Sequence, residues 1–156
     1  MEGKQENVEH SLLLDLIREG GSRAEPVAVT EAGALFRDLG CTVIAAAPGE
    51  VRLGFRCGAA HVQGNGIVNG GIVATMLDLG LAWAALTRLP AERSAATIAL
   101  NVAFLRPALP GAFTVTGRTV AFGYRTAQSE AQLCDAEGRL IATATSPLAL
   151  RGGGGG

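Results

Sequence analysis

The stretch 69-NGGIVATMLDLGLAWAAL-86 decides the fold, because only one of its side chains, that of Asp78, carries a charge. No other Asp, Glu, Lys or Arg occurs between Arg56 and Arg88. The stretch predicts a helix with apolar side chains on every face. Such a helix is stable only when the rest of the protein encloses it on all sides. Burying an unpaired carboxylate costs several kcal/mol. Asp78 therefore indicates either a function or a structural role in which a neighbour such as Thr75 holds it.

The residues on both sides of this helix show the alternation that is typical of β-strands. Residues 41–57 predict a hairpin about Pro48-Gly49, with Val51, Leu53 and Phe55 on one face of its second arm. Four strand-like runs separated by turn residues follow the helix, and we expect them to form an antiparallel meander: 95–105, 112–122, 126–135 and 140–150. The pattern predicts an α+β fold in which a curved antiparallel sheet wraps one long central helix, with a second copy of the chain covering what remains.

Two shorter helices are predicted before the hairpin. The first has Ser11 as its N-cap and stops at Gly20-Gly21, and the second has Thr30 as its N-cap and stops at Gly40. The predicted organisation has three parts: an N-terminal helical extension over 1–27, the main domain over 28–150 and a disordered glycine tail over 151–156.

The composition predicts one domain without a nucleic-acid or membrane partner. The chain has 156 residues, of which 48% are hydrophobic, enough for one core and hardly enough for two. Its net charge of −1 gives no electrostatic reason to bind nucleic acid or an anionic membrane. The run 69–86 approaches the length of a membrane span, but its central Asp and opening Gly-Gly disfavour that interpretation.

The cysteines and histidines argue against a disulfide framework and against a metal site. Cys41, Cys57 and Cys134 are odd in number, widely spaced and set in apolar surroundings, which is typical of reduced thiols in a cytosol. The only histidines are His10 and His61, and no CxxC or HxxxH spacing occurs, so we expect no zinc site. The polar N-terminus lacks the basic region and apolar run of a signal peptide, and we therefore expect a cytoplasmic protein.

The start of the apolar helix is a candidate binding site for a developing negative charge. Helix N-termini carry free N–H groups and a partial positive charge, and Gly70 and Gly71 have no side chains to keep a ligand away. Such an end can bind a carbonyl oxygen as it becomes negative, although a tight entry into the helix also explains Gly-Gly. Asp78 lies eight residues beyond Gly70, about 12 Å along the helix axis. Two antiparallel helices across a twofold axis would bring Gly70 of one subunit near Asp78 of the other, and the dimer would build the site.

Residues 61–84, HVQGNGIVNGGIVATMLDLGLAWA, resemble the signature of the hotdog-fold acyl-CoA thioesterases of the phenylacetate-degradation and 4-hydroxybenzoyl-CoA type. That signature reads His-x-Asn/Gln, a Gly, then His-Gly-Gly, with an Asp or Glu nine residues after the second His. The likeness extends from about Thr30 to Leu148, and residues 97–111, TIALNVAFLRPALPG, are similar to the family's strand after the helix. The resemblance implies a hotdog fold, thioester hydrolysis without metal or cofactor, and a homodimer that can pair into a homotetramer.

The resemblance also implies roles for individual residues. Asp78 matches the catalytic carboxylate, which acts as nucleophile or as general base for water, and Gly70 matches the glycine whose amide polarises the thioester carbonyl. Gln63 stands where the family positions water or substrate, and Thr97 where some members have a Ser or Thr that faces the carboxylate across the dimer. Asn69 replaces the histidine of His-Gly-Gly. It can cap the helix and donate a hydrogen bond, but it cannot transfer protons near neutral pH.

Other residues are candidates for contact with the substrate. Gly71 continues the helix start. His61 is a candidate to compensate for the replaced histidine, although it is equally well explained as an ordinary loop histidine. Coenzyme A carries phosphates and an adenine, which members of the family bind on the dimer surface. The candidate contacts are Arg106, Arg118 and Arg125 for the phosphates and Tyr124 for the adenine. Each arginine is equally explained as a solvated strand residue.

The sequence thus predicts an acyl-CoA thioesterase that acts on a small, medium or aryl acyl group and needs a dimer for its site. Two alternatives stay open. One is a hotdog protein that binds acyl-CoA without turning it over, which the replaced histidine makes credible. The other is a hotdog enoyl-CoA hydratase or dehydratase, which pairs a carboxylate with a histidine, and here only His61 is available for that role.

Overall fold

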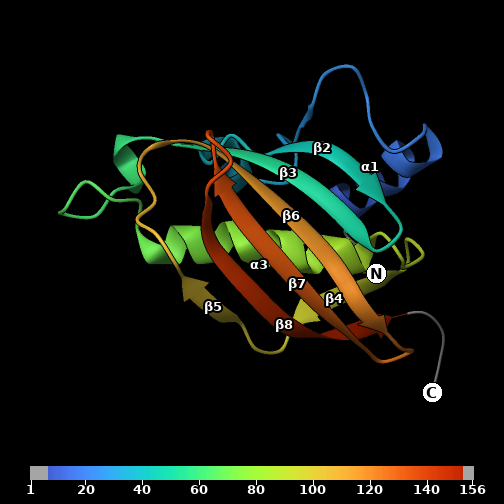
Figure 1. Ribbon diagram of the computed structural model, residues 1–156. Coiled ribbons are helices and arrows are strands. Elements are labelled where there is room, and N and C mark those ends of the chain that lie inside the picture. The colour runs from blue at the N-terminus through green and yellow to red at the C-terminus, as the bar shows by residue number, and fades with distance from the viewer. Residues whose placement is uncertain (1–6, 153–156) are drawn as a thin grey trace.

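One curved sheet wraps one long helix in this protein (Figure 1). The computed structural model describes residues 7–152. An antiparallel sheet of eight strands curves around α3 (Gly70–Leu86), as the sequence predicts. The other elements, in chain order, are α1 (Val8–Arg18), β1 (Val27–Ala28), α2 (Ala34–Asp38), β2 (Thr42–Ala47), β3 (Glu50–Cys57), the short 3-10 helix η1 (Ala59–His61), β4 (Arg93–Thr97), β5 (Asn101–Phe104), β6 (Gly111–Phe122), β7 (Thr126–Asp135) and β8 (Leu140–Gly152).

The central helix α3 begins and ends where the sequence predicts, with Asn69 as its N-cap. Its side chains toward the sheet, among them Met76 and Leu77, are fully buried. Gly80 of α3 packs against Gly117 of β6 so closely that a Cβ on Gly117 would overlap the Gly80 carbonyl. These two glycines let the helix backbone approach the middle of the concave face of the sheet.

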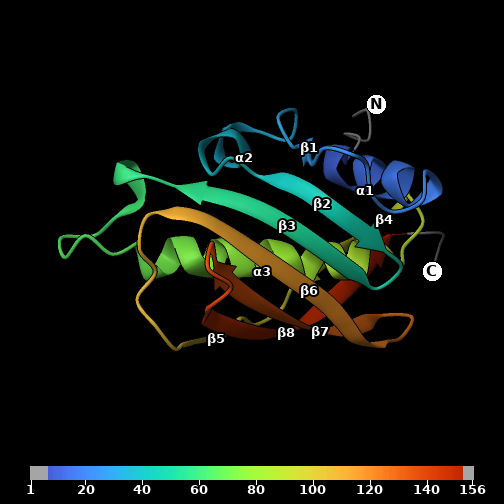
Figure 2. The ribbon, with the colours of Figure 1, turned by 45° about the horizontal axis from the view of Figure 1, so that its top comes forward.

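The four strand runs after α3 do not form a meander in chain order, which corrects the sequence prediction. The strand order is β1-β2-β3-β6-β7-β8-β4, and β5 also pairs with β8 (Figure 2). The run predicted as one strand over 95–105 is two strands, β4 and β5, at the edge of the sheet. Short turns keep β6, β7 and β8 next to one another, whereas the loop 105–110 carries the chain across to pair β6 with β3.

Helix α1 begins earlier than predicted and belongs to the main core. Its N-cap is Asn7, whose side chain accepts a hydrogen bond of 2.9 Å from the His10 N–H, and Ser11 lies inside the helix. Leu13 and Leu16 of this helix are fully buried. The helix packs against β2 and α3.

The second predicted helix is a single short turn. It was expected from Thr30 to Gly40, but α2 spans only Ala34–Asp38 and begins after Gly33, which has a φ of 134°. That backbone conformation is incompatible with a helix, so Thr30 does not act as a cap. Strand β1, which the sequence analysis did not predict, precedes this turn and pairs with β2.

The C-terminal strand extends into the predicted glycine tail. Arg151 and Gly152 belong to β8, where they pair with Ser94 and Arg93 of β4, so these two residues are ordered. The rest of that tail, residues 153–156, lies outside the described residues.

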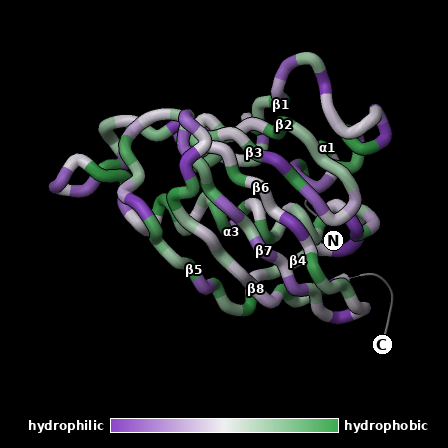
Figure 3. The backbone as a smooth tube through the Cα atoms, viewed as in Figure 1, coloured by the Kyte–Doolittle hydropathy of each residue, from purple (hydrophilic) through white to green (hydrophobic). Residues whose placement is uncertain are grey.

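Hydrophobic and hydrophilic residues alternate along the strands, which gives the sheet a core face and an outer face (Figure 3). The three cysteines are free thiols, as expected. Burial raises the pKa of Cys41 to about 12 and that of Cys57 to about 11. Within residues 7–152, no helix is long and apolar enough to cross a membrane.

Candidate active site

The first turn of α3 leaves one backbone N–H available to a ligand. The Asn69 side chain accepts from the Gly71 N–H at 2.8 Å, and the Asn69 carbonyl accepts from Ile72 and Val73 at 2.9 and 3.2 Å. Within the described part of the chain, the Gly70 N–H has no acceptor at hydrogen-bond distance. Gly70 is exposed. Its amide, at the positive end of a helix dipole, is therefore free to bind an oxygen from outside the chain.

The loop that leads into α3 is held together by His61. The ring is 8% exposed, its Nδ1 accepts from the Gly58 N–H at 3.0 Å, and its Nε2 lies 2.9 Å from Asp38 Oδ2. The His61 carbonyl accepts from the Asn69 N–H at 2.8 Å. Because Nδ1 accepts, we assign the proton to Nε2, which donates to the carboxylate. Both ring nitrogens thus have partners inside the protein, and neither is free to bind a substrate in this conformation.

A cavity of about 330 Å³ opens beside the first turn of α3. Gln63, Gly70 and Arg106 provide its polar lining. The apolar lining includes Val68, Val73, Phe104 and Ile141. The free Gly70 amide therefore lies at a site that can take an apolar group next to a polar one. Gln63 is exposed there, and its side-chain oxygen accepts from the Asn65 N–H at 2.8 Å.

Asp78 lies on the face of α3 that points away from the sheet, where the side chains are only half-buried. Its Oδ1 accepts a hydrogen bond of 2.7 Å from Thr97 Oγ1 of β4. Thr75, the residue suggested as a structural partner, donates instead to the Gly71 carbonyl at 2.9 Å. The sequence predicts that Thr97 faces Asp78 across a dimer, whereas β4 packs beside α3 and already brings both residues together in one chain.

One chain does not bring Asp78 to Gly70. Both residues lie on the same unbroken helix, eight residues and therefore about 12 Å apart along its axis. The predicted site residues thus fall into two groups, with Asn69, Gly70 and Gln63 at the helix start and Asp78 with Thr97 farther along. Over residues 7–152, no set of three His, Cys, Asp or Glu side chains is arranged to hold a metal ion.

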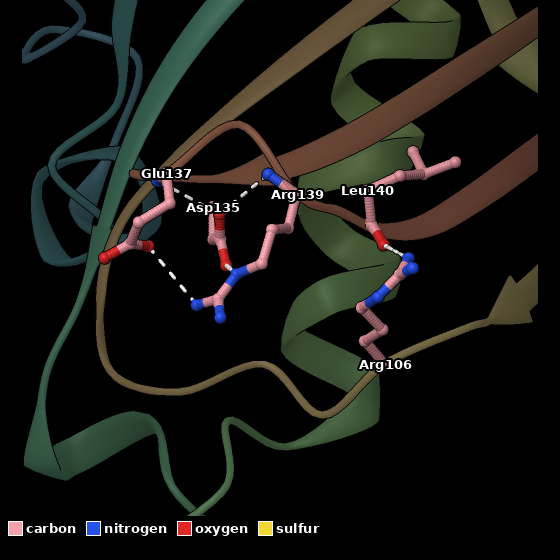
Figure 4. Close-up of polar contacts among 5 residues, drawn as sticks. All are labelled: Arg106, Asp135, Glu137, Arg139 and Leu140. Atoms are coloured by element: carbon pink, nitrogen blue, oxygen red, sulfur yellow. Dashed lines mark hydrogen bonds and ion pairs between the residues drawn. The ribbon is translucent and has the colours of Figure 1, made fainter.

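Arg106 lies between this cavity and a second one of about 480 Å³, and it lines both. Its Nη1 donates to the Leu140 carbonyl at 2.7 Å (Figure 4). Arg139 of the β7–β8 turn, which the sequence did not single out, lines the second cavity. Local sequence gives no indication of this, because the tertiary structure alone brings the β7–β8 turn beside Arg106.

The charge of Arg139 is balanced by carboxylates of its own turn. Its guanidinium lies 2.7 Å from Asp135 Oδ2 and 3.3 Å from Glu137 Oε2 (Figure 4). Burial acts to raise the pKa of Asp135, but hydrogen bonds from the Arg139 amide and guanidinium outweigh it and keep that pKa below its ordinary value. Arg106 is therefore the cation of this region whose charge has no carboxylate partner within the described residues.

The other predicted nucleotide contacts lie away from the first turn of α3. Arg118 stands on the outer face of β6, with its Nη2 2.5 Å from Glu130 Oε1. Tyr124 and Arg125 belong to the β6–β7 turn at the opposite end of the sheet (Figure 1). The Tyr124 ring is 70% exposed, and the Arg93 guanidinium lies 4.8 Å from its centroid. One chain does not bring these residues to the cavity beside Gly70.

Comparison with known proteins assigns this chain to a family. The sequence pattern of the thioesterase superfamily matches residues 65–142, half of the chain. The chain belongs to the thioesterase superfamily. The matched residues contain the free Gly70 amide, the Asp78–Thr97 pair and Arg106.

Solved structures related to this superfamily share the hotdog fold, as predicted. A thioesterase family protein of Silicibacter pomeroyi is 29% identical, with a TM-score of 0.73 over 78% of this chain and 91% of that chain. A phenylacetic acid degradation-related protein of Ralstonia eutropha is 27% identical, with a TM-score of 0.73 over 88% of this chain and 98% of that chain. The Escherichia coli PaaI protein from the phenylacetic acid degradation operon matches in fold alone, with 18% identity and a TM-score of 0.74 over 94% of this chain and 96% of that chain.

A further relative, found by sequence comparison, aligns with about half of this chain. A protein of Halobacterium salinarum with a proposed esterase function is 42% identical over 79 residues. The alignment covers 47% of this chain and 52% of that relative. The chain thus matches about half the length of this relative.

Proposed function

We propose that this superfamily member hydrolyses an acyl-CoA thioester to coenzyme A and a carboxylic acid, at sites that two copies of the chain build together. The free Gly70 amide, at the positive end of α3 and beside an apolar cavity, is the observation that carries the proposal. A developing oxyanion needs such a donor. Membership of the thioesterase superfamily supports hydrolysis of a thioester, and the sequence resemblance supports coenzyme A as its thiol.

A second copy is needed because one chain leaves both halves of the site incomplete. The face of α3 that carries Asp78 is only half-covered, and β4 and β5 form an edge without a further strand. That edge carries exposed apolar residues, among them Ile98, Leu100 and Leu105. An open apolar edge favours pairing with another chain. Two α3 helices that run antiparallel across a twofold axis then place each Gly70 opposite Asp78 of the partner subunit.

The proposed reaction uses the two groups on opposite sides of the thioester. The Gly70 N–H binds the carbonyl oxygen and stabilises its negative charge as the tetrahedral intermediate forms. Asp78 of the partner subunit either removes a proton from the attacking water or attacks the carbonyl carbon itself. Thr97, on the same chain as Asp78, fixes the carboxylate through its hydroxyl. The C–S bond then breaks, and the coenzyme A thiolate leaves and takes up a proton. If Asp78 itself attacked, water then hydrolyses the mixed anhydride on Asp78 and releases the carboxylic acid.

Two further side chains complete the proposed site. Gln63 lines the cavity beside Gly70, where its side-chain amide is placed to orient water or the acyl group. Arg106 borders the same cavity and, among the predicted arginines, is best placed for a phosphate of coenzyme A. Contacts of the nucleotide with Arg118, Tyr124 and Arg125 stay predictions, as does the pairing of dimers into a tetramer.

The arrangement of His61 disfavours the hydratase alternative. A hydratase of this fold needs a free imidazole for proton transfer at carbon, whereas both ring nitrogens of His61 are bonded to Gly58 and Asp38. An assay of thiol release distinguishes hydrolysis from the alternative of binding without turnover. Thiol release from a panel of aliphatic and aryl acyl-CoAs should be rapid for the wild type and reduced at least about a hundredfold for Asp78→Asn.

The matched control for that variant is Asp15→Asn, which removes an exposed carboxylate of α1 and should leave turnover unchanged. Wild-type protein that binds acyl-CoA but releases no thiol would support the non-catalytic alternative. An Asp78→Asn variant as active as the wild type would contradict the role of the carboxylate.

Mixed dimers test whether the two groups come from different chains. Gly70→Pro removes the N–H, and Asp78→Asn removes the carboxylate, so each variant alone should be inactive. In a dimer of one copy of each, one site has both changes and the other has neither. Statistical mixing by co-refolding should therefore restore about a quarter of wild-type activity. If Gly70 and Asp78 acted within one chain, mixing would restore nothing.

A further inference from the structure

The side chain that covers the start of α3 is that of Phe104, the last residue of β5. A Cβ built on Gly70 would lie 3.4 Å from Cζ of this ring and 3.5 Å from Cε1. The ring therefore stands directly over the residue whose amide is free. It also lines the cavity of about 330 Å³ together with Gly70 and Gln63.

The position of Phe104 follows from the register of β5. Residues 102 and 104 share a face of the strand, and Val102 on that face packs against the hydrophobic core. Phe104 nevertheless stays 57% exposed, because the strand ends there and the cavity lies beneath the ring. A large aromatic side chain that is exposed over a cavity gains free energy when an apolar ligand covers it.

We propose that Phe104 sets the size of the acyl group that the site accepts, and that the acyl chain lies in the cavity beneath its ring. This inference rests on the proposed function. A thioester whose oxygen is bound by the Gly70 N–H must place its first acyl carbons against whichever side chain covers Gly70. That side chain is Phe104. Beyond the ring, the apolar lining continues through Val73, Val68 and Ile141, so the acyl group passes between Phe104 and the first two turns of α3.

The size of the Phe104 ring then limits the length of the acyl chain that fits in the cavity. One methylene that no longer fits an apolar pocket, or that leaves a gap in it, changes kcat/KM about tenfold or more. Phe104 is a single exposed side chain, and its replacement leaves the buried core of the protein intact. Phe104 is therefore a specificity-determining residue whose substitution can be separated from loss of the fold.

The test measures kcat/KM for straight-chain acyl-CoAs from acetyl to dodecanoyl in dimeric protein. Phe104→Ala should move the optimum to longer chains and raise the ratio of long-chain to short-chain kcat/KM about tenfold or more. Phe104→Trp should move the optimum to shorter chains. Val120→Ala is the matched control, since Val120 is 50% exposed on β6 and lines neither cavity, and its chain-length profile should equal that of the wild type.

The outcomes separate this inference from the proposed function. Wild-type hydrolysis with opposite shifts for the two Phe104 variants supports the inference. An equal change in kcat/KM for all chain lengths would show that the pantetheine arm or another part of the substrate lies under the ring, and it overturns the inference while leaving the proposed function standing. If the wild-type dimer hydrolyses no acyl-CoA at all, the proposed function fails, and the inference fails with it.

Discussion

Thr97 Oγ1 donates a hydrogen bond of 2.7 Å to Asp78 Oδ1, across 19 residues of sequence and between two different elements. The bond joins the edge strand β4 to the half-buried face of α3. It fixes one carboxylate oxygen of Asp78 on the face of α3 that points away from the sheet. A hydroxyl that holds a reacting carboxylate in one orientation affects turnover more than binding.

Replacing Thr97 tests that bond. Thr97→Val keeps the shape of the side chain but removes the donor, and a hydrogen bond to a charged group contributes about 1.5–3 kcal/mol. We therefore expect kcat to fall about 10- to 100-fold with little change in KM. Thr97→Ser keeps the hydroxyl and should restore most of the activity. Equal rates for the Val variant and the wild type would show that the hydroxyl has no part in the reaction.

The Gly70 amide is tested by two substitutions, of which only one keeps the N–H. Pro is tolerated at the first position of a helix, and the Asn69 backbone, with φ −55° and ψ 135°, has the conformation required before Pro. Gly70→Pro should lower kcat about 10²- to 10³-fold, as expected for loss of one oxyanion donor. Gly70→Ala adds a Cβ but keeps the N–H, so its loss in kcat should be much smaller. Similar losses in both variants would assign the effect to steric crowding at Phe104.

Asn69 has a structural role that can be measured without a substrate. Its side chain caps α3 through the Gly71 N–H. Asn69→Ala should lower the free energy of unfolding by about 1 kcal/mol, whereas Asn69→Ser, which keeps a capping oxygen, should lower it much less. Chemical denaturation of both variants measures the difference. An Ala variant as stable as the wild type would mean that the cap contributes nothing.

A substitution at the edge formed by β4 and β5 tests whether activity needs a dimer. Ile98 is 58% exposed on the edge, and a lysine there would bury a charge wherever a second chain covers it. Ile98→Lys should reduce the mass in solution to that of one 15.9 kDa chain and abolish thiol release together with it. Leu35→Lys changes a residue of α2 that is 47% exposed and should alter neither property. A monomeric variant with full activity would contradict a site built by two chains.

The buried thiols predict a loss of stability at high pH. Burial raises the pKa of Cys41 to about 12 and of Cys57 to about 11, whereas a thiol in the unfolded chain has a pKa near 9.0. Above about pH 9 the unfolded chain therefore binds fewer protons than the folded chain, and the free energy of unfolding falls as the pH rises toward 11. Denaturant unfolding at pH 8 and pH 10.5 measures the decrease. A Cys41→Ala/Cys57→Ala variant should show a smaller decrease, and an unchanged one would assign it to other groups.

The local sequence was sufficient for the elements that depend on neighbouring residues. The bounds of α3, the hairpin of β2 and β3, and the turns around β7 follow from apolar periodicity, capping residues and glycines, which act within a few residues of one another. The lone charge of Asp78 and the bare helix start at Gly70 are visible in the same way, and they led to both halves of the candidate site.

Only the tertiary structure decided which distant residues meet. Local patterns do not specify strand order, and it is the placement of β4 and β5 beside β8 that brings Thr97 to Asp78 and Phe104 over Gly70. The same holds for His61. The sequence makes it a candidate for substrate binding, but α2 brings Asp38 within 2.9 Å of its ring, and this contact holds the loop together instead. Periodicity and capping are set by the nearest neighbours along the chain, whereas these contacts arise from the packing of the whole sheet around one helix.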